Sequence, residues 1–326
     1  MSTEFLAENV APPELAAAVM GLAPANPFCT LSYAEAQRAY GHQPWLLGIK
    51  RGGKLIAACY GFLASGRLNS ALEIRSLPDL PWDEVFWDGL VRFCSMHRIS
   101  YLLLDNRGSP GVRIPPLPGE VERYDQCDYV LDLRDPEWEQ KVATHHWRKI
   151  EMALQSGLTL RRTGGADACR EHAQLRIASM ERRHKRGELT PDEVEKGFPT
   201  ALLLTEKGAG ELFQAVAGSK ALSSALVLKA TEGAYYDSAG TSPEGMKCGA
   251  SHFLIYSIAR ALREESMRVF NLGGAESDPG LSLFKSRFGA TPVPIESAKF
   301  YLGSDLRRKL TDAAHFLRRI GTLSSL

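Results

Sequence analysis

The chain has 326 residues, of which 44% are hydrophobic and 24% are charged, and its formal net charge at pH 7 is +1. This length favours two domains of about 150 residues each over one very large domain. The near-neutral charge gives no global reason to expect nucleic-acid or membrane binding, so any basic recognition surface has to be local.

The six cysteines are scattered along the chain and form neither a CxxC pair nor a zinc-like spacing, so we expect reduced thiols. The residues after Met1 lack the basic segment and apolar run of a signal peptide. No segment approaches about 18 uninterrupted apolar residues, the length that a membrane-spanning helix needs. These features predict a soluble, cytoplasmic protein.

A two-strand hairpin, a third strand, a helix and a fourth strand follow one another in the first half of the chain. Apolar runs and turn residues mark the strands, and a stripe of apolar residues marks the helix. Their expected ranges are 45–49, 55–63, 68–74, 82–97 and 101–104.

The same order of elements returns in the second half. With a shift of 166 residues, Lys54 falls on Lys220, Leu104 on Phe270 and Gly108 on Gly274 without a gap. The sequence identity between the copies is low, but the constant offset predicts a structural duplication. Each copy is expected to form a mixed sheet in which a right-handed crossover joins two parallel strands.

Between the copies lie a segment rich in Pro and Gly at 108–119, a strand-like run at 129–133, and a helix that opens at Asp135-Pro136 and ends near Gly157. We therefore expect an amino-terminal domain over 1–157 and a second domain over 158–300. Residues 301–326 are expected to form a carboxy-terminal amphipathic helix.

The segment from Asn271 to Gly289 combines a strand end, a glycine loop and a capped helix. Asp278 has the position of an N-cap, with Pro279 first in the helix, and Gly289 ends it. Leu281, Phe284 and Phe288 share one helical face, which predicts that this face is core and that Lys285 points elsewhere with its charge free. A cation beside a glycine loop suits an anionic or carbonyl-bearing ligand, whereas the alternative is an ordinary strand-turn-helix with a solvated lysine.

Four segments carry a resemblance to a known family: 147–158 (WRKIEMALQSGL), Tyr235-Tyr236, 272–274 (LGG) and 280–289 (GLSLFKSRFG). In this order, together with the duplicated hairpin and crossover, they resemble the FemABX peptidyltransferases. They equally resemble GNAT-type acyltransferases of the BioF2-like or CelD-like group. The resemblance covers roughly residues 28–300, and the last segment is the most specific.

The resemblance implies an α/β fold of tandem GNAT-like (acyl-CoA N-acyltransferase) domains whose mixed sheets face a central cleft. Such proteins move an aminoacyl group from aminoacyl-tRNA, or an acyl group from a CoA thioester, onto an amine or hydroxyl. By the same analogy, Phe284 and Lys285 contact the acyl donor. The chain departs from the pattern in lacking a long helical arm and a clean pyrophosphate loop; the nearest equivalent is 244–250, in which Lys247 and Gly249 are the donor-binding candidates.

Acyl transfer to an amine needs a proton acceptor and a stabilised oxyanion. Lys285 can supply positive charge, and the backbone N–H groups of Gly273 and Gly274, or of the helix after Met246, can cradle a phosphate. The candidates for the general base are Asp237, Glu276 and Asp278, of which Asp278 is the weakest because capping explains it. Tyr236 is a candidate proton donor to the leaving group.

Basic clusters are a second signal for binding. Arg148-Lys149, Arg161-Arg162 and the run 182–186, which includes Arg182, Arg183 and Arg186, are candidates to bind tRNA phosphates or a nucleotide-sugar pyrophosphate. The alternative for each cluster is a solvated helix face. That alternative is favoured for Arg161-Arg162 and balanced for the longer run.

Other chemistries find little support in the sequence. His145 and His146 are adjacent in a helix and point about 100° apart, so they do not chelate one metal ion. There is no G-x-S-x-G elbow for a serine nucleophile. The carboxy-terminal helix from Ser304 carries an apolar stripe flanked by arginines; it either closes a domain or lies on the inner face of a membrane.

The sequence therefore predicts an acyltransferase that moves an aminoacyl or acyl group onto an amine of a cell-envelope or polysaccharide precursor. Its donor substrate is an acyl-CoA or an aminoacyl-tRNA, and neither a metal nor a permanently bound cofactor is expected. One alternative is an acetyl-CoA-dependent N-acetyltransferase of a small-molecule amine. Another is a catalytically silent binding module of the same fold.

Overall fold

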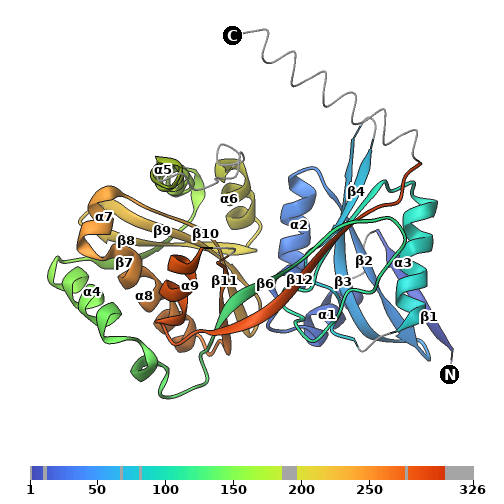
Figure 1. Cartoon of the computed structure of the whole chain (residues 1–326), viewed down its shortest axis with the longest axis horizontal. Coiled ribbons are helices and arrows are strands. Elements are labelled where there is room, and N and C mark those ends of the chain that lie inside the picture. Colours follow the sequence, from blue (N-terminus) through green and yellow to red (C-terminus); the bar gives the residue numbers. More distant parts are fainter. Residues whose placement is uncertain are drawn as a thin grey trace, which may run out of the picture. The chain divides into compact units, whose positions relative to one another are not determined.

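The computed structural model describes residues 2–9, 13–66, 69–80, 83–185, 197–275 and 278–304. The chain divides into two units (Figure 1). Unit 1 comprises residues 1–22, 41–125 and 295–326, and unit 2 comprises residues 23–40 and 126–294.

The strands of unit 1 are ordered β1-β2-β3-β4-β5-β12 in its sheet. Only β4 and β5 are parallel neighbours; the other pairs are antiparallel. The elements are β1 (Thr3–Glu8), α1 (Pro13–Leu22), β2 (Gln43–Arg51), β3 (Lys54–Ser65), β4 (Ser70–Ile74), α3 (Glu84–Met96), β5 (Tyr101–Asp105) and β12 (Thr291–Tyr301).

The crossover helix α3 of unit 1 forms where the sequence combines a cap with an apolar stripe. Asp83 is its N-cap, and its carboxylate accepts a hydrogen bond from the Val85 N–H at 2.9 Å. Phe86, Leu90 and Phe93 recur at helical spacing and are buried. This stripe fixes α3 against the sheet on the β1 and β2 side.

The strands of unit 2 are ordered β7-β8-β9-β10-β11-β6, and only β10 and β11 are parallel neighbours. Helices α5 and α6 cover one face of this sheet, and α4, α8 and α9 lie on the other (Figure 1). The strands are β6 (Glu120–Asp132), β7 (Thr159–Thr163), β8 (Gly210–Ala217), β9 (Lys220–Lys229), β10 (Gly233–Thr241) and β11 (Val269–Gly274). The helices are η1 (Pro27–Cys29), α2 (Leu31–Ala39), η2 (Trp138–Lys141), α4 (Thr144–Gln155), α5 (Gly165–Lys185), α6 (Gly197–Glu206), α7 (Pro243–Cys248), α8 (Ala250–Glu264) and α9 (Pro279–Ser286).

The expected duplication is confirmed by this topology. The hairpin β2–β3, strand β4, helix α3 and strand β5 have the same pairing as β8–β9, β10, α8 and β11. The two copies also exchange their sixth strands. The chain leaves β5 into β6, which pairs with β11 of unit 2, and leaves α9 into β12, which pairs with β5 of unit 1.

The strand exchange moves the division of the chain away from the expected boundary at residue 157. Residues 126–157 group with unit 2 because β6 pairs with β11 and α4 packs on α8. The short segment 23–40 also joins unit 2, where the Phe28 ring packs against Tyr235 at 5.1 Å between centroids. The helix expected over 301–326 lies mostly outside the described residues, which end at Ser304.

None of the described helices is both long enough and apolar enough to cross a lipid bilayer.

Candidate active site

The parallel strands of unit 2 separate before they end. β10 and β11 are paired from Gly233 with Val269 to Tyr235 with Asn271. β10 then continues to Thr241 and β11 to Gly274, and no register pair joins them over these described residues. A bulge at Asp237 in β10 accompanies the separation. The result is a length of β10 edge whose backbone groups are not used by β11.

The end of β11 is held by one lysine and one asparagine. Gly273 has φ +73°, a left-handed conformation that glycine adopts without strain, and its N–H donates to the Asn271 side-chain oxygen at 2.7 Å. The Lys285 ammonium donates to the Gly273 carbonyl at 3.0 Å and also to the Gly274 carbonyl. These bonds fix the loop that follows β11 at the point where β10 and β11 part.

Helix α9 starts as the sequence predicts, but Lys285 does not point where expected. Asp278 caps the helix and accepts hydrogen bonds from the N–H groups of Gly280 and Leu281. The expectation that Lys285 keeps a free charge is wrong: only 6% of this residue is exposed. Lys285 is four residues from Leu281 and therefore lies on the same inward side of the helix, where its ammonium reaches the β11 carbonyls.

A carboxylate that the sequence analysis did not select lies beside this loop. Asp128 on β6 is fully buried, and its Oδ2 accepts a hydrogen bond from Asn271 Nδ2 at 2.9 Å. Its other oxygen, Oδ1, has no hydrogen-bond partner. An acid directly before the strand-like run at 129–133 is a weak signal, and its partner is 143 residues away in the chain.

The other catalytic candidates occupy β10 or fall outside the description. Tyr236 is half-buried, packs against the Phe270 ring at 6.2 Å, and has its pKa raised by burial, so its phenol keeps its proton near neutral pH. Asp237 is half-buried at the bulge. Glu276 lies outside the described residues. Tyr236 and Asp237 thus lie where β10 leaves β11, and their roles stay predictions.

The turn between α7 and α8 was expected to offer backbone N–H groups to a phosphate. In α7, the Gly245 N–H donates to the Ser242 hydroxyl at 2.9 Å and the Met246 N–H to the Ser242 carbonyl at 3.0 Å. Gly249 has φ +78°, and a side chain there would clash with the carbonyl of Lys149 on α4. These two amides are already engaged and α4 covers Gly249, while Lys247 is exposed.

Phe284 is part of a cluster with histidines rather than an open contact surface. Its ring lies 5.2 Å from His146 and 5.0 Å from His252, and its carbonyl accepts a hydrogen bond from His146 Nε2 at 2.9 Å. Burial lowers the pKa of both histidines, to about 3 for His252. Both imidazoles are therefore neutral at pH 7, and Nε2 of His146 carries the proton.

The basic candidates divide into engaged and exposed side chains. Arg182 donates to the carbonyls of Ala178 and Thr241, so it ties the end of α5 to the end of β10. Arg148 is exposed on α4, and Lys149 is half-buried. The remaining positions are Arg183, which is half-buried in the last turn of α5, and Arg186, which lies outside the described residues.

A buried polar chain under α5 also escaped the sequence analysis. His172 is fully buried, with Nδ1 at 3.0 Å from the Ser224 hydroxyl and Nε2 at 3.1 Å from the Ser238 hydroxyl. Burial, and to a lesser extent Arg176, lowers the pKa of His172 to about 3. Because protonation is so unfavourable there, His172 is suited to hold Ser238 in place on β10 and not to act as a general base.

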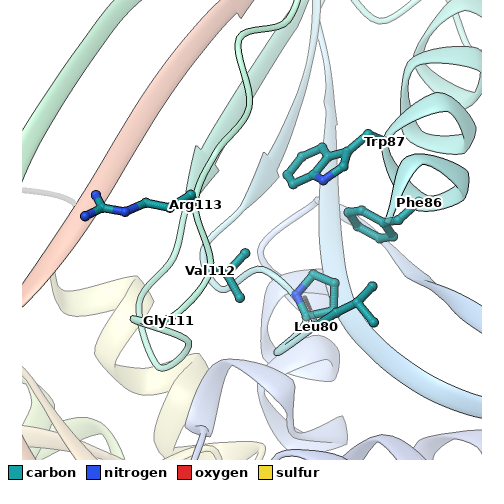
Figure 2. A pocket seen from close by; sticks show the side chains of 7 residues that line it. Leu80, Phe86, Trp87, Gly111, Val112 and Arg113 are labelled. Carbon is teal, nitrogen blue, oxygen red and sulfur yellow. The ribbon is translucent and has the colours of Figure 1, made fainter. Parts of the chain in front are cut away.

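The matching strand ends of unit 1 are closed. β4 and β5 are paired through Ile74 and Leu104, and the Leu77 N–H then donates to the Asp105 carbonyl at 3.1 Å. A cavity of about 220 Å³ remains nearby, lined mainly by apolar side chains of α3 and of the loops that follow β4 and β5 (Figure 2). The side chain of Arg113 points away from Trp87 in this view. The cavity therefore has little polar chemistry to offer a substrate.

Comparison with known proteins agrees with this geometry. Residues 140–285 match the family model described as Acetyltransferase (GNAT) domain. Residues 140–285 are thus similar in sequence to GNAT acetyltransferase domains, and the mixed sheet with its parallel strand pair is the fold that the sequence analysis expected. No curated protein sequence matches the chain.

Solved structures with the same fold extend over nearly the whole chain. FemX superposes with a TM-score of 0.69 at 15% identity, covering 94% of this chain and 99% of FemX. A tandem GNAT protein from the clavulanic acid biosynthesis pathway superposes with a TM-score of 0.57 at 12% identity, covering 93% of this chain and 100% of that protein. The C-terminal domain of a putative lysylphosphatidylglycerol synthetase from Agrobacterium fabrum superposes with a TM-score of 0.56 at 17% identity, covering 92% of this chain and 95% of that domain. The expected tandem GNAT-like, FemX-like fold is thereby confirmed.

Proposed function

We propose that this protein transfers an aminoacyl group from aminoacyl-tRNA onto an amine of a cell-envelope or polysaccharide precursor, with the donor bound in unit 2. The fold supports acyl transfer in general, and FemX and a lysylphosphatidylglycerol synthetase domain are among the proteins that share it. The choice of donor rests on the local geometry of unit 2.

The observation that carries the proposal is the separation of β10 from β11. An acyl donor is a chain of amide and ester groups, and the edge of β10 beyond Tyr235 offers backbone groups of matching spacing. The separation ends at Gly273 and Gly274, whose carbonyls are held by Lys285. A carbonyl of the donor placed there would lie close to a fixed positive charge, which favours its tetrahedral oxyanion.

The turn before α8 supports an aminoacyl ester over a CoA thioester. A pyrophosphate bound by backbone N–H groups needs several of them unused and converging. Here the N–H groups of Gly245 and Met246 bond to Ser242, and Lys149 packs over Gly249. The phosphate backbone of a tRNA can instead be bound by exposed cations such as Arg148. It does not need several unused N–H groups at that turn.

The side chains of β10 fit supporting roles in this reaction. Tyr236 is protonated at neutral pH, as any phenol is, and burial raises its pKa further, so it is able to donate a hydrogen bond to the leaving oxygen. Asp237 at the bulge is one of the sequence-based candidates for the base, beside Glu276 and Asp278. Ser238 is held by His172 and presents a fixed hydroxyl on the α5 face of the strand.

The test is a donor competition with purified protein. The protein is incubated with a mixture of radiolabelled aminoacyl-tRNAs, or with labelled acetyl-CoA, and with amine acceptors that include a lysine-containing peptidoglycan-type peptide and glucosamine. The proposal expects label transfer from aminoacyl-tRNA only, and no calorimetric binding of CoA at 100 μM. Transfer from acetyl-CoA, or micromolar CoA binding, would replace the donor with a CoA thioester. Transfer from neither donor by folded protein favours the silent binding module.

A further inference from the structure

Asp128 is a buried carboxylate that the fold leaves half unsatisfied. None of its surface is exposed, and Asn271 binds only its Oδ2. Its Oδ1 has no hydrogen-bond partner, and no ion pair reaches Asp128 from the described residues. A buried carboxylate oxygen without a donor costs more stability than a neutral polar group in the same position. A residue kept at such a cost calls for a donor from outside the chain.

The three atoms nearest to the side of Gly274 that lacks a side chain are oxygens. Around the bare Cα of Gly274, the point where a Cβ would stand lies 3.4 Å from Asp128 Oδ1, 3.6 Å from the Cys127 carbonyl oxygen and 3.7 Å from Gln126 Oε1. Three oxygens therefore gather beside Gly274, and the nearest is a carboxylate oxygen. A group that brings several N–H donors and a positive charge complements such a set, and a primary ammonium has three donors.

Lys285 does not fill this role. Its ammonium donates to the carbonyls of Gly273 and Gly274, on the loop that separates it from Asp128. Asn271 holds both sides of the arrangement, because its amide nitrogen donates to Asp128 and its oxygen accepts from the Gly273 N–H. The lysine and the asparagine thus fix the loop and leave the carboxylate charge available.

We propose that Asp128 Oδ1 binds the primary ammonium group of the acceptor substrate beside Gly274 and takes its first proton. The acceptor R–NH₃⁺ loses one proton to the carboxylate, which becomes a carboxylic acid. The neutral amine attacks the carbonyl carbon of the aminoacyl ester, a C–N bond forms, and the C–O bond to the leaving group breaks. The second N–H proton goes to the leaving oxygen, which departs as an alcohol. The proton step rests on the proposed transferase function, but the binding step is tested without it.

Binding is tested with a minimal amine. The ¹⁵N-labelled protein is titrated with n-propylammonium chloride and, as a matched uncharged probe, with N-propylacetamide, and the amide signals of Gly273 and Gly274 are followed. We expect saturable shifts with the ammonium only. Equal shifts with both probes, or none with either, would overturn the site.

Two variants keep this test independent of folding. Asp128→Asn still accepts from Asn271 through its side-chain oxygen but places an NH₂ donor where Oδ1 was, so ammonium binding is lost while the melting temperature stays equal or rises. Gly274→Ala places a methyl group at ordinary contact distance from the three oxygens, with no left-handed φ to strain, and also abolishes the shifts. Gly164→Ala, on the exposed surface of the same unit, is the matched control and changes nothing. A less stable Asp128→Asn, or one that still binds the ammonium, contradicts the proposal.

Turnover provides the second readout. With any donor that the wild-type protein uses, we expect Asp128→Asn to lower kcat/KM by about 10²–10³-fold at pH 7. Its rate should then recover as pH rises and the free amine becomes available, which a merely structural residue would not produce. Wild-type-like turnover in this variant overturns the inference alone. Ammonium binding without any transfer overturns the proposed function alone. Loss of aminoacyl-tRNA affinity in place of acceptor affinity would move the ammonium to the donor and contradict the acceptor site.

Discussion

The two units share one strand order but end their parallel strand pairs in opposite ways. In unit 1, β4 and β5 are paired over four residues each, a further bridge joins Ser76 to Asn106, and the Leu77 N–H bonds to Asp105. In unit 2, β10 and β11 are paired over three residues and then part. The same topology thus gives a closed sheet end in one copy and an open one in the other.

Local side chains account for the difference. In unit 1 the Asn106 amide donates to the Val112 carbonyl and its oxygen accepts from the Glu296 N–H, so the loop after β5 folds back on the strand end. In unit 2 the loop after β11 is held away by the left-handed Gly273 and by Lys285. A duplication therefore allows one copy to serve as scaffold while the other keeps a usable strand edge.

The crossover helices repeat this contrast. Helix α3 is capped by Asp83 and has Glu84 in its first turn, which disfavours an anion there. Helix α8 has Gly249 at its N-cap, no side-chain cap and no acid in its first turn. Of the two crossover helices, α8 is therefore the one whose start carries no acidic side chain.

The largest expected effect comes from Lys285, which holds the open end in place. Lys285→Met leaves the carbonyls of Gly273 and Gly274 without this donor, so we expect a loss of about 10²–10³-fold in kcat, the range for a lost electrostatic group, and a lower melting temperature. Transfer assays and thermal unfolding measure the two effects. The matched variant Lys54→Met, at an exposed lysine of unit 1, should change neither by more than about twofold. Full activity in Lys285→Met would show that the open end does not depend on this ammonium.

Equivalent repeat positions provide the next test. Asn271 and Asp105 are 166 residues apart and occupy matching places at the ends of β11 and β5. Asn271→Asp sets a second carboxylate against Asp128, which should cost about 2–4 kcal/mol of unfolding free energy at pH 7. Urea unfolding at pH 7 measures the loss, and Asn271→Leu, which removes the same two hydrogen bonds without adding a charge, is the comparison. An equal loss in both variants would contradict the charge explanation.

The reverse substitution in unit 1, Asp105→Asn, should not lower the free energy of unfolding at pH 7. Burial raises the pKa of Asp105, with Arg107 and Ser297 opposing the shift. The folded state then binds its proton more tightly than the unfolded state, so stability falls as pH rises above the unfolded value through the raised pKa. Asp105→Asn removes that dependence and should leave stability at pH 7 unchanged or slightly higher. Marked destabilisation at pH 7 would mean that the carboxylate is needed in its ionised form.

Acid should weaken unit 2 more than unit 1, because the buried histidine of the α5 face belongs to unit 2. His172 has its pKa lowered to about 3, so below pH 6.5 the unfolded chain binds a proton that the folded chain does not. Its contribution is a loss of about 1.4 kcal/mol per pH unit, or roughly 2 kcal/mol between pH 6.5 and 5. His172→Gln keeps a donor and an acceptor for the two serines but should make this slope shallower by the share of His172, while His146 and His252 keep theirs. Hydrogen exchange of unit 2 amides at pH 7 and 5 reports it, and an unchanged slope would assign the acid sensitivity elsewhere.

The elements that the sequence predicted are those governed by local rules. The repeat order, the Asp278 cap and the glycine loop after β11 follow from periodicity and from residue preferences over a few positions. The grouping of residues 126–157 with unit 2 could not be predicted, because the exchange of β6 and β12 between the copies is a long-range pairing. The local amino-acid composition does not indicate this exchange of strands.

The sequence selected residues at the end of β11 and on β10 but did not predict their contacts. The periodic face of α9 predicted that Lys285 points away from the core, whereas its ammonium bonds to the β11 carbonyls. His172 did carry a signal: it lies three residues after Cys169 and next to Ala173, on the apolar side of α5. Asp128 carried almost none, since its partner on β11 is distant in sequence.

The smallest expected effects are on tRNA affinity, and they should differ between exposed and hydrogen-bonded arginines of unit 2. Arg148 is exposed, with no hydrogen bond or ion pair among the described residues, whereas Arg182 bonds to Thr241 and Ser179. Arg148→Ala should weaken aminoacyl-tRNA binding about 3–10-fold and reduce the slope of log affinity against log salt by about one. Arg182→Ala should leave both quantities unchanged and instead speed hydrogen exchange at the end of β10. If Lys54→Ala in unit 1 weakens tRNA binding as much as Arg148→Ala does, the attraction is general to the surface, and the open strand end of unit 2 does not select the donor by its backbone charge.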